Sequence, residues 1–207
     1  MSQHEDVPWE KLTTLQSNPP EGRGLKTYEE TLGFRISELK GNVLDLGSGR
    51  RELFRKEAEA ANKNIKVVSL NPDYSDEDYR VLQKFAGNTS ERSVAGLAEQ
   101  LPFKDETFDY IFANFSVSVY SDPKQMDKFG HMWVNELNRV LKANGEAIIF
   151  PFVGFAREDV IKKYNDFLDT LNSLGLLYVL EFSNFTWRGL DTFRIVIKKL
   201  PSSSAEK

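Results

Sequence analysis

The chain has 207 residues, of which 40% are hydrophobic and 12% aromatic, enough apolar side chains to build one packed domain. Its 27 basic and 31 acidic residues give a formal net charge of −4, which disfavours a uniformly basic nucleic-acid-binding surface. The absence of cysteine excludes thiol catalysis, disulfides and cysteine-ligated zinc or iron–sulfur clusters. With only two histidines, His4 and His131, we expect no metal site.

The first ten residues are polar and acidic and lack the basic and apolar regions of a signal peptide. No apolar run approaches the roughly 18 residues that a membrane-spanning helix needs. We therefore expect a cytoplasmic protein without a membrane span, and its oligomeric state is left open.

Short apolar segments alternate with helical ones along the chain. A first helix is predicted around the apolar stripe of Tyr28, Leu32, Ile36 and Leu39, which recur every three or four residues. Strands are predicted at 42–46, 65–70, 93–97, 108–113 and 146–152, with helices between the first three.

The C-terminal part continues this alternation and then changes. A long helix is predicted to begin at Asp122 and Pro123 and to end at Asn144 and Gly145, because these residue types suit the two ends of a helix. Another helix is predicted over 159–174. Strands at 176–182 and 192–200 follow with no helix between them, and the short connection favours an antiparallel return.

This order predicts an α/β fold, a doubly wound, mainly parallel sheet of seven strands with an antiparallel last strand. We expect an irregular N-terminal arm over 1–24, one domain over 25–200 and a polar tail over 201–207. Such sheets bind ligands beyond the carboxyl ends of their strands, where the direction of winding reverses.

A glycine-containing turn directly follows the first predicted strand. Segment 43–51, VLDLGSGRR, places Asp45 at the end of the strand and Gly47 and Gly49 in the turn toward a helix. Glycines there allow tight dihedrals and the close approach of a ligand to backbone N–H groups. A simple strand-to-helix connection is the alternative interpretation.

This segment resembles the first motif of the class I S-adenosylmethionine-dependent methyltransferases, an acidic residue followed by Gly-x-Gly-x-Gly. Segments 98–103 (AEQLPF) and 106–111 (ETFDYI) are similar to the family's linked third and fourth strands. Segment 136–145 (ELNRVLKANG) is similar to its helix-to-strand-five junction. The resemblance runs from about residue 28 to residue 199 and is nearest to small-molecule and quinone-type methyltransferases. It implies a Rossmann-like methyltransferase fold and S-adenosylmethionine as cofactor.

The resemblance also implies a set of cofactor-binding residues. The methionine part would lie against the Asp45 strand end and the glycine turn, the ribose against the end of the second strand, and the adenine against the turn after the third. The end of the fourth strand would line the space between methyl donor and acceptor. The residues at these positions are Asp45, Gly47, Ser48, Gly49, Asn71, Leu97, Ala98 and Asn114. No catalytic residue is assigned, because methyl transfer depends mainly on alignment.

Three positions depart from the family pattern. Arg51 replaces the third glycine, Asn71 replaces the acid that holds the ribose, and Leu97 replaces the acid that binds adenine. Since charge-assisted hydrogen bonds are the stronger ones, these departures predict a weakened affinity for S-adenosylmethionine.

Three functions follow as hypotheses. The first is a methyltransferase acting on a small-molecule acceptor, which the sequence does not identify. The second is a binding or scaffold domain of this fold that has lost catalysis. The third, a nicotinamide-dependent oxidoreductase, is disfavoured because Glu52 stands where the dinucleotide fingerprint needs a glycine. Tyr28 and His131 are expected to have structural roles.

Overall fold

The computed structural model describes residues 13–14, 22–49, 51–75, 92–117, 123–153, 158–187 and 190–201. The helices are α1 (Leu25–Leu32), α2 (Leu53–Ala61), α4 (Pro123–Val140) and α5 (Glu158–Ser173), with the 3₁₀ segments η2 (Ile36–Glu38) and η3 (Pro72–Ser75). The strands are β1 (Thr13–Thr14), β2 (Gly41–Leu46), β3 (Ile65–Leu70), β4 (Ser93–Val94), β5 (Phe108–Asn114), β6 (Leu141–Val153), β7 (Leu176–Trp187) and β8 (Leu190–Lys199).

The strands form one sheet in the order β1-β7-β8-β6-β5-β2-β3-β4. Strands β4, β3, β2, β5 and β6 run parallel, whereas β8 is antiparallel to both β6 and β7. The seven predicted strands and the antiparallel last one are thereby confirmed. Strand β1, within the arm expected to be irregular, adds a two-residue edge beside β7.

The central strands β2 and β5 are covered on both faces, and successive residues of each strand point to opposite sides. In β2, Val43 packs with α1 and α2, whereas Leu44 packs with residues of α4 and α5. In β5, Phe112 packs with residues of α1 and α2, whereas Ile111 packs with residues of α4 and α5. This explains why the strands are continuous apolar runs, which is typical of parallel sheets covered on both sides.

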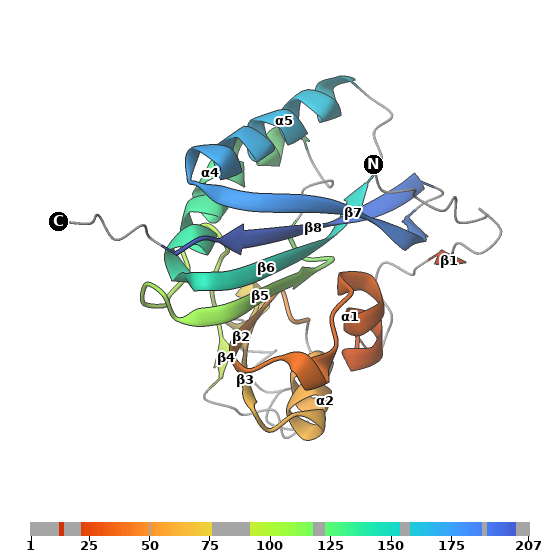
Figure 1. The fold of residues 1–207 in the computed structure, drawn as a ribbon, viewed down its shortest axis with the longest axis vertical. Coiled ribbons are helices and arrows are strands. Elements are labelled where there is room, and N and C mark those ends of the chain that lie inside the picture. The colour runs from red at the N-terminus through yellow and green to blue at the C-terminus, as the bar shows by residue number, and fades with distance from the viewer. Residues whose placement is uncertain are drawn as a thin grey trace.

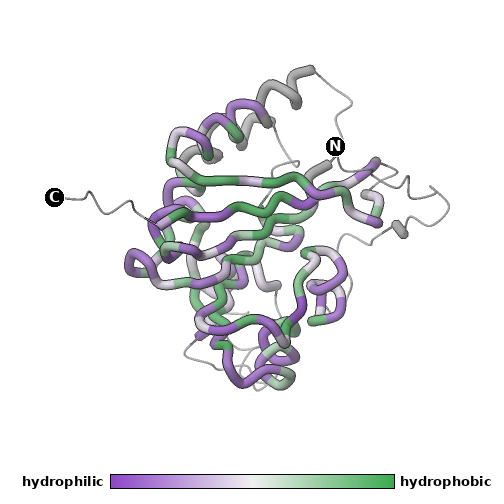
Figure 2. Tube along the Cα trace, in the orientation of Figure 1, coloured by the Kyte–Doolittle hydropathy of each residue, from purple (hydrophilic) through white to green (hydrophobic). Residues whose placement is uncertain are grey.

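The helices form two layers around the sheet. Figure 1 shows α4 and α5 together on one side and α1 with α2 on the other, in agreement with the contacts between these pairs. Figure 2 shows hydrophobic residues concentrated along the central strands. Among the described helices, none combines the length and hydropathy that a membrane span requires.

The first predicted helix is interrupted. Helix α1 ends at Leu32, Gly33 adopts a left-handed conformation at φ 73°, and the chain resumes as the 3₁₀ segment η2. The predicted stripe nevertheless stays on one side, since Tyr28, Leu32 and Ile36 all lie in the same buried cluster. The apolar spacing identified the buried face but did not reveal the glycine stop.

Three other boundaries differ from the prediction. Helix α4 ends at Val140, because Leu141 already pairs with Phe108 of β5. Strand β4 ends at Val94 rather than at residue 97. Strands β7 and β8 continue pairing as far as Trp187 and Leu190, so the expected connection is mostly strand. Asp122 and the helix expected between β3 and β4 fall outside the described residues.

Phe54 joins the helical layer to the sheet beneath the glycine turn. Its ring is fully buried, is stacked on Tyr28 at a centroid distance of 4.0 Å, and meets Phe112 edge-on at 6.0 Å. We expect Phe54→Ala to lower the free energy of unfolding by about 3–5 kcal/mol, the usual cost of removing a buried aromatic ring. Urea denaturation measures this loss.

Phe182→Ala is the matched control, because that ring is 37% exposed. A clearly smaller loss is expected there. Equal losses for the two variants would contradict the anchoring role of Phe54.

Candidate functional site

The direction of winding reverses at β2, whose neighbours in the sheet are β3 and β5. The carboxyl ends of these three parallel strands lie at one edge of the sheet (Figure 1). The predicted site residues Asp45, Asn71 and Asn114 lie at or directly after these ends. The tertiary structure therefore brings them to neighbouring positions although they are far apart in the sequence.

The turn after β2 is bound to the end of β3. The backbone N–H groups of Gly47 and Ser48 both donate to the carbonyl of Leu70, at 2.8 and 3.2 Å. Gly47 has φ 79°, and a Cβ built there would lie only 2.0 Å from the Cβ of Ser116. Gly49 has φ 68° but open space above it. Glycine at 47 is thus required by packing, whereas Gly49 leaves its backbone accessible.

Tyr74 in η3 ties this turn to the segment after β3. Its buried hydroxyl is 2.6 Å from the Ser48 Oγ and donates to the Gly49 carbonyl at 3.0 Å. Sequence reasoning did not identify Tyr74, because nothing in the local pattern signals a contact 25 residues away. The turn is therefore held in shape from the neighbouring strand end.

Asp45 is completely buried at the end of β2. The Tyr28 hydroxyl of α1 donates to its Oδ1 at 2.8 Å, whereas Oδ2 has no hydrogen-bond partner among the described residues. Burial raises the pKa of Asp45 to about 7, the Tyr28 hydrogen bond and Arg55 oppose that rise, and Glu52 adds to it. Burial and Asp45 raise the pKa of Tyr28 in turn. Tyr28 is buried as expected, but its hydrogen bond to Asp45 was not predicted.

A buried ion pair lies at the start of α2. Glu52 precedes the helix in a left-handed conformation at φ 49°, and its carboxylate pairs with Arg55. Both side chains are buried, and both act electrostatically on Asp45. Arg55 thus pairs with Glu52 and acts on Asp45 only through its charge. Arg51, the residue at the third glycine position, is exposed.

The end of β5 carries further buried polar atoms. The Oδ1 and Nδ2 atoms of Asn114 and the Oγ of Ser116 lack hydrogen-bond partners within the described part of the chain. The Arg23 guanidinium, just before α1, lies over the Phe115 ring at 3.9 Å from its centroid. Since buried polar groups normally find partners, this strand end has the character of a ligand site.

The remaining predicted residues lie further along the same edge. Asn71 is buried, its N–H donates to the Val94 carbonyl at 3.1 Å, and its carbonyl accepts from Tyr74. Leu97 and Ala98 are in the turn after β4, where Leu97 bridges to Gln100. Leu97 is 56% exposed, whereas Ala98 packs against the core. None of these three side chains places a charge at the edge of the sheet.

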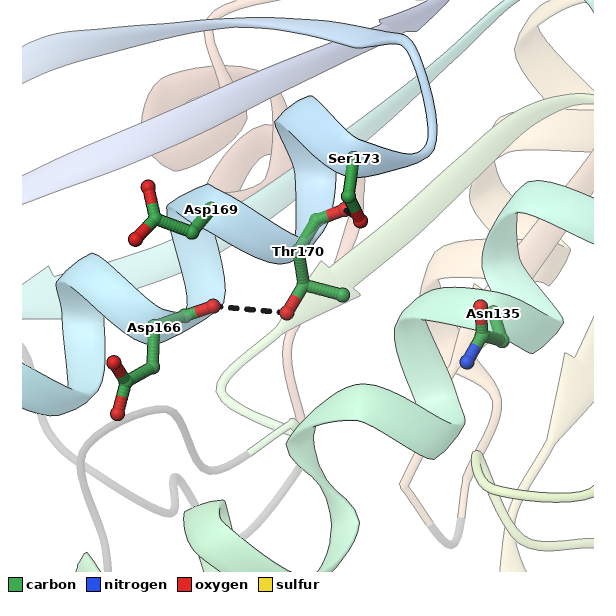
Figure 3. Close-up of a pocket in the computed structure, with 5 residues that line it drawn as sticks. All are labelled: Asn135, Asp166, Asp169, Thr170 and Ser173. Atoms are coloured by element: carbon green, nitrogen blue, oxygen red, sulfur yellow. Dashed lines mark hydrogen bonds between the residues drawn. The ribbon is translucent and has the colours of Figure 1, made fainter.

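A surface depression between α4 and α5 has a different character. It is lined by Asn135, Asp166, Asp169, Thr170 and Ser173 (Figure 3). The Thr170 and Ser173 hydroxyls donate to carbonyls of their own helix, at 2.8 Å each. Because these hydroxyls already donate hydrogen bonds within α5, the strand ends with their unpartnered polar atoms are the better candidate site.

Known proteins show similarity over most of the chain. The methyltransferase domain family matches residues 44–149, half of the chain. The ubiquinone/menaquinone biosynthesis C-methyltransferase UbiE of Rickettsia massiliae is 28% identical over 179 residues, 79% of this chain and 69% of the relative. A SAM dependent methyltransferase from Aquifex aeolicus superposes with TM-score 0.52 at 17% identity, covering 78% of this chain and 85% of that one. A geranyl diphosphate methyltransferase in complex with GPP and sinefungin gives TM-score 0.56 at 14% identity, covering 85% and 77%.

The contrast between the two glycines of the turn gives a prediction. Gly47→Ala combines the left-handed strain of about 1–2 kcal/mol with a clash against Ser116, so we expect a loss of stability of several kcal/mol. Gly49→Ala, the matched control, should show only the strain because the space above it is open. Urea denaturation of both variants measures the difference, and equal losses would contradict the packing of Gly47 on Ser116.

The buried carboxyl of Asp45 gives a second prediction. Its pKa rises from 3.8 in the unfolded chain to about 7 in the folded one, so the unfolded state loses this proton first. Stability should therefore fall as the pH rises from about 4 to 7, by up to about 4 kcal/mol. Asp45→Asn should abolish this part of the slope in urea denaturation.

Asp169→Asn, on the exposed side of α5, is the control and should leave the slope unchanged. An Asp45→Asn variant with the wild-type pH dependence would show that Asp45 ionises normally in the fold.

Proposed function

The chain belongs to the methyltransferase domain family, and we propose that it binds S-adenosylmethionine beyond the ends of β2 and β5 and transfers its methyl group to a small-molecule acceptor. The acceptor class is supported by the relatives. The relative from Rickettsia massiliae is named for ubiquinone and menaquinone biosynthesis, and a fold neighbour was solved with geranyl diphosphate. Both names concern the chemistry of small molecules.

The observation that carries the proposal is the set of buried polar atoms without partners at two adjacent strand ends. The Asp45 Oδ2 is an acceptor with partial negative charge, which suits the ammonium group of the cofactor's methionine part. The Asn114 amide and the Ser116 hydroxyl supply donors and acceptors beside it. Gly49 offers open space above its backbone. These residues fit a polar, cationic ligand of the cofactor's kind.

Each predicted site residue then has a proposed part. Asp45 and the Gly47-Ser48-Gly49 turn would hold the methionine end of the cofactor. Asn71 would form hydrogen bonds with the ribose hydroxyls. Leu97 and Ala98 would border the adenine, with Ala98 packed against the core and Leu97 at the surface. Asn114 would face the space in which the acceptor approaches.

Methyl transfer requires little acid–base chemistry from these side chains. S-adenosylmethionine, when bound, supplies a methyl group already activated by its sulfonium. The chain's own part is to bind, orient and exclude water, so that the acceptor and the methyl group lie in line. No general base is assigned among the residues proposed for the site, none of which is a histidine.

A second candidate, a scaffold domain without catalysis, is favoured by one observation. Asn71 is neutral and Leu97 is 56% exposed, so neither position supplies the carboxylate that the family uses toward ribose and adenine. Two missing charge-assisted hydrogen bonds can weaken binding by a factor of roughly ten to several thousand.

Calorimetric titration with S-adenosylhomocysteine separates the two candidates. Saturable binding in the micromolar range would support the methyltransferase and justify a search among small-molecule acceptors. No binding at millimolar ligand would overturn the proposal and leave the scaffold domain.

Asn71→Asp tests where the ribose lies. A carboxylate at this position should strengthen the hydrogen bonds to the ribose hydroxyls and raise the affinity about tenfold. Asn64→Asp, at an exposed asparagine just before β3, controls for the added charge and should leave the affinity unchanged. Wild-type affinity in both variants would contradict the placement of the ribose without affecting the methyl-transfer proposal.

A further inference from the structure

The two oxygens of the Asp45 carboxyl group have different surroundings. Oδ1 accepts a hydrogen bond from the Tyr28 hydroxyl at 2.8 Å, and Oδ2 is buried without a partner in the described structure. Leaving a buried acceptor unpaired costs free energy that the rest of the fold must offset. Oδ2 is therefore the atom at which a bound donor would gain most.

Tyr28 is held firmly enough to orient this carboxyl group. The side chain is buried, and its ring lies parallel to Phe54, with a centroid distance of 4.0 Å and an interplanar angle of 6°. Because the ring cannot turn away without losing this stack, its hydroxyl stays directed at Oδ1. Tyr28 thus determines which oxygen of Asp45 is left for a ligand.

The other charged and titratable groups around Asp45 come from three directions. Glu52 and Arg55 face it from the start of α2, with opposite effects on its ionisation. Arg23, before α1, and Tyr74, in η3, act on Tyr28. Burial dominates over these charges, so the carboxyl group retains its proton up to about pH 7. A cation bound at Oδ2 would stabilise the ionised carboxylate and so lower the pKa of Asp45.

We propose that Tyr28 is a positioning residue that presents Oδ2 of Asp45 to the ammonium group of the ligand. The inference rests on the proposed function. During binding the carboxyl O–H bond breaks and its proton passes to the solvent. The ligand ammonium then donates to Oδ2, while the Tyr28 hydroxyl continues to donate to Oδ1. The affinity for the cofactor is thereby coupled to pH near neutrality.

The first test counts protons in the wild-type protein. S-adenosylhomocysteine is titrated calorimetrically at pH 6 and 7 in buffers of different ionisation enthalpy, where the ligand's amino group is mostly protonated. We expect release of nearly one proton at pH 6 and about half a proton at pH 7. Binding without proton release would overturn the inference and leave the proposed function intact. No binding at either pH would overturn both.

The second test removes the hydroxyl group. Tyr28→Phe should release nearly a full proton at pH 7 and bind S-adenosylhomocysteine about tenfold more weakly there, with a smaller loss as the pH rises. Tyr110→Phe is the matched control, since this tyrosine packs in the same apolar cluster and has no hydrogen bond to Asp45. It should retain the wild-type affinity and proton count.

A readout without ligand separates positioning from a merely structural role. Carboxyl ¹³C NMR of the ligand-free protein follows the ionisation of Asp45 directly. Its pKa should be higher in Tyr28→Phe than in the wild type, because the hydrogen bond that stabilises the carboxylate is lost. An unchanged pKa in a folded Tyr28→Phe variant would overturn the role of Tyr28.

Discussion

The hydrogen bond from the Tyr28 hydroxyl to the buried Asp45 joins the elements on which the candidate site is built. It connects α1 to the end of β2, and the stack of Tyr28 on Phe54 extends the connection to α2. The glycine turn connects β2 to α2. The position of the turn therefore depends on a polar contact at the centre of an otherwise apolar cluster.

Keeping a carboxyl group at this depth is costly for the fold. Burial without full hydrogen bonding raises its pKa to about 7 and leaves Oδ2 without a partner among the residues described. Such arrangements are concentrated where proteins bind ligands or perform chemistry. In the proposed function, the cost in the free protein is offset when a cation binds at Oδ2.

The rest of the edge is less charged than its family resemblance implies. Asn71 and Leu97 supply no carboxylates toward the proposed ribose and adenine, whereas Asp45 and Asn114 are polar and buried and the half-buried turn is bound by Tyr74. We infer that the methionine end of the cofactor contributes more to affinity here than the nucleoside end does. A site of this kind would respond to pH through Asp45 more strongly than through any other group described at these strand ends.

Much of the fold was predictable from the sequence, because the central strands are buried on both faces and so appear as short apolar runs between amphipathic helices. The mainly parallel sheet of seven strands with its antiparallel last strand and the glycine turn after Asp45 followed from that alternation and from the family resemblance. The break at Gly33 and the early end of α4 did not follow, because a capping conformation and a strand pairing override local spacing.

The pairing of Tyr28 with Asp45, the Tyr74 bond to the turn and the fit of Gly47 against Ser116 also depend on tertiary structure alone. Each joins side chains on different elements, and no sequence period encodes which of several buried polar groups will meet. The sequence by itself thus determined the class of fold and the family. The three-dimensional packing decided which atom of Asp45 is left for a ligand, because hydrogen-bond partners are assigned only when the elements meet.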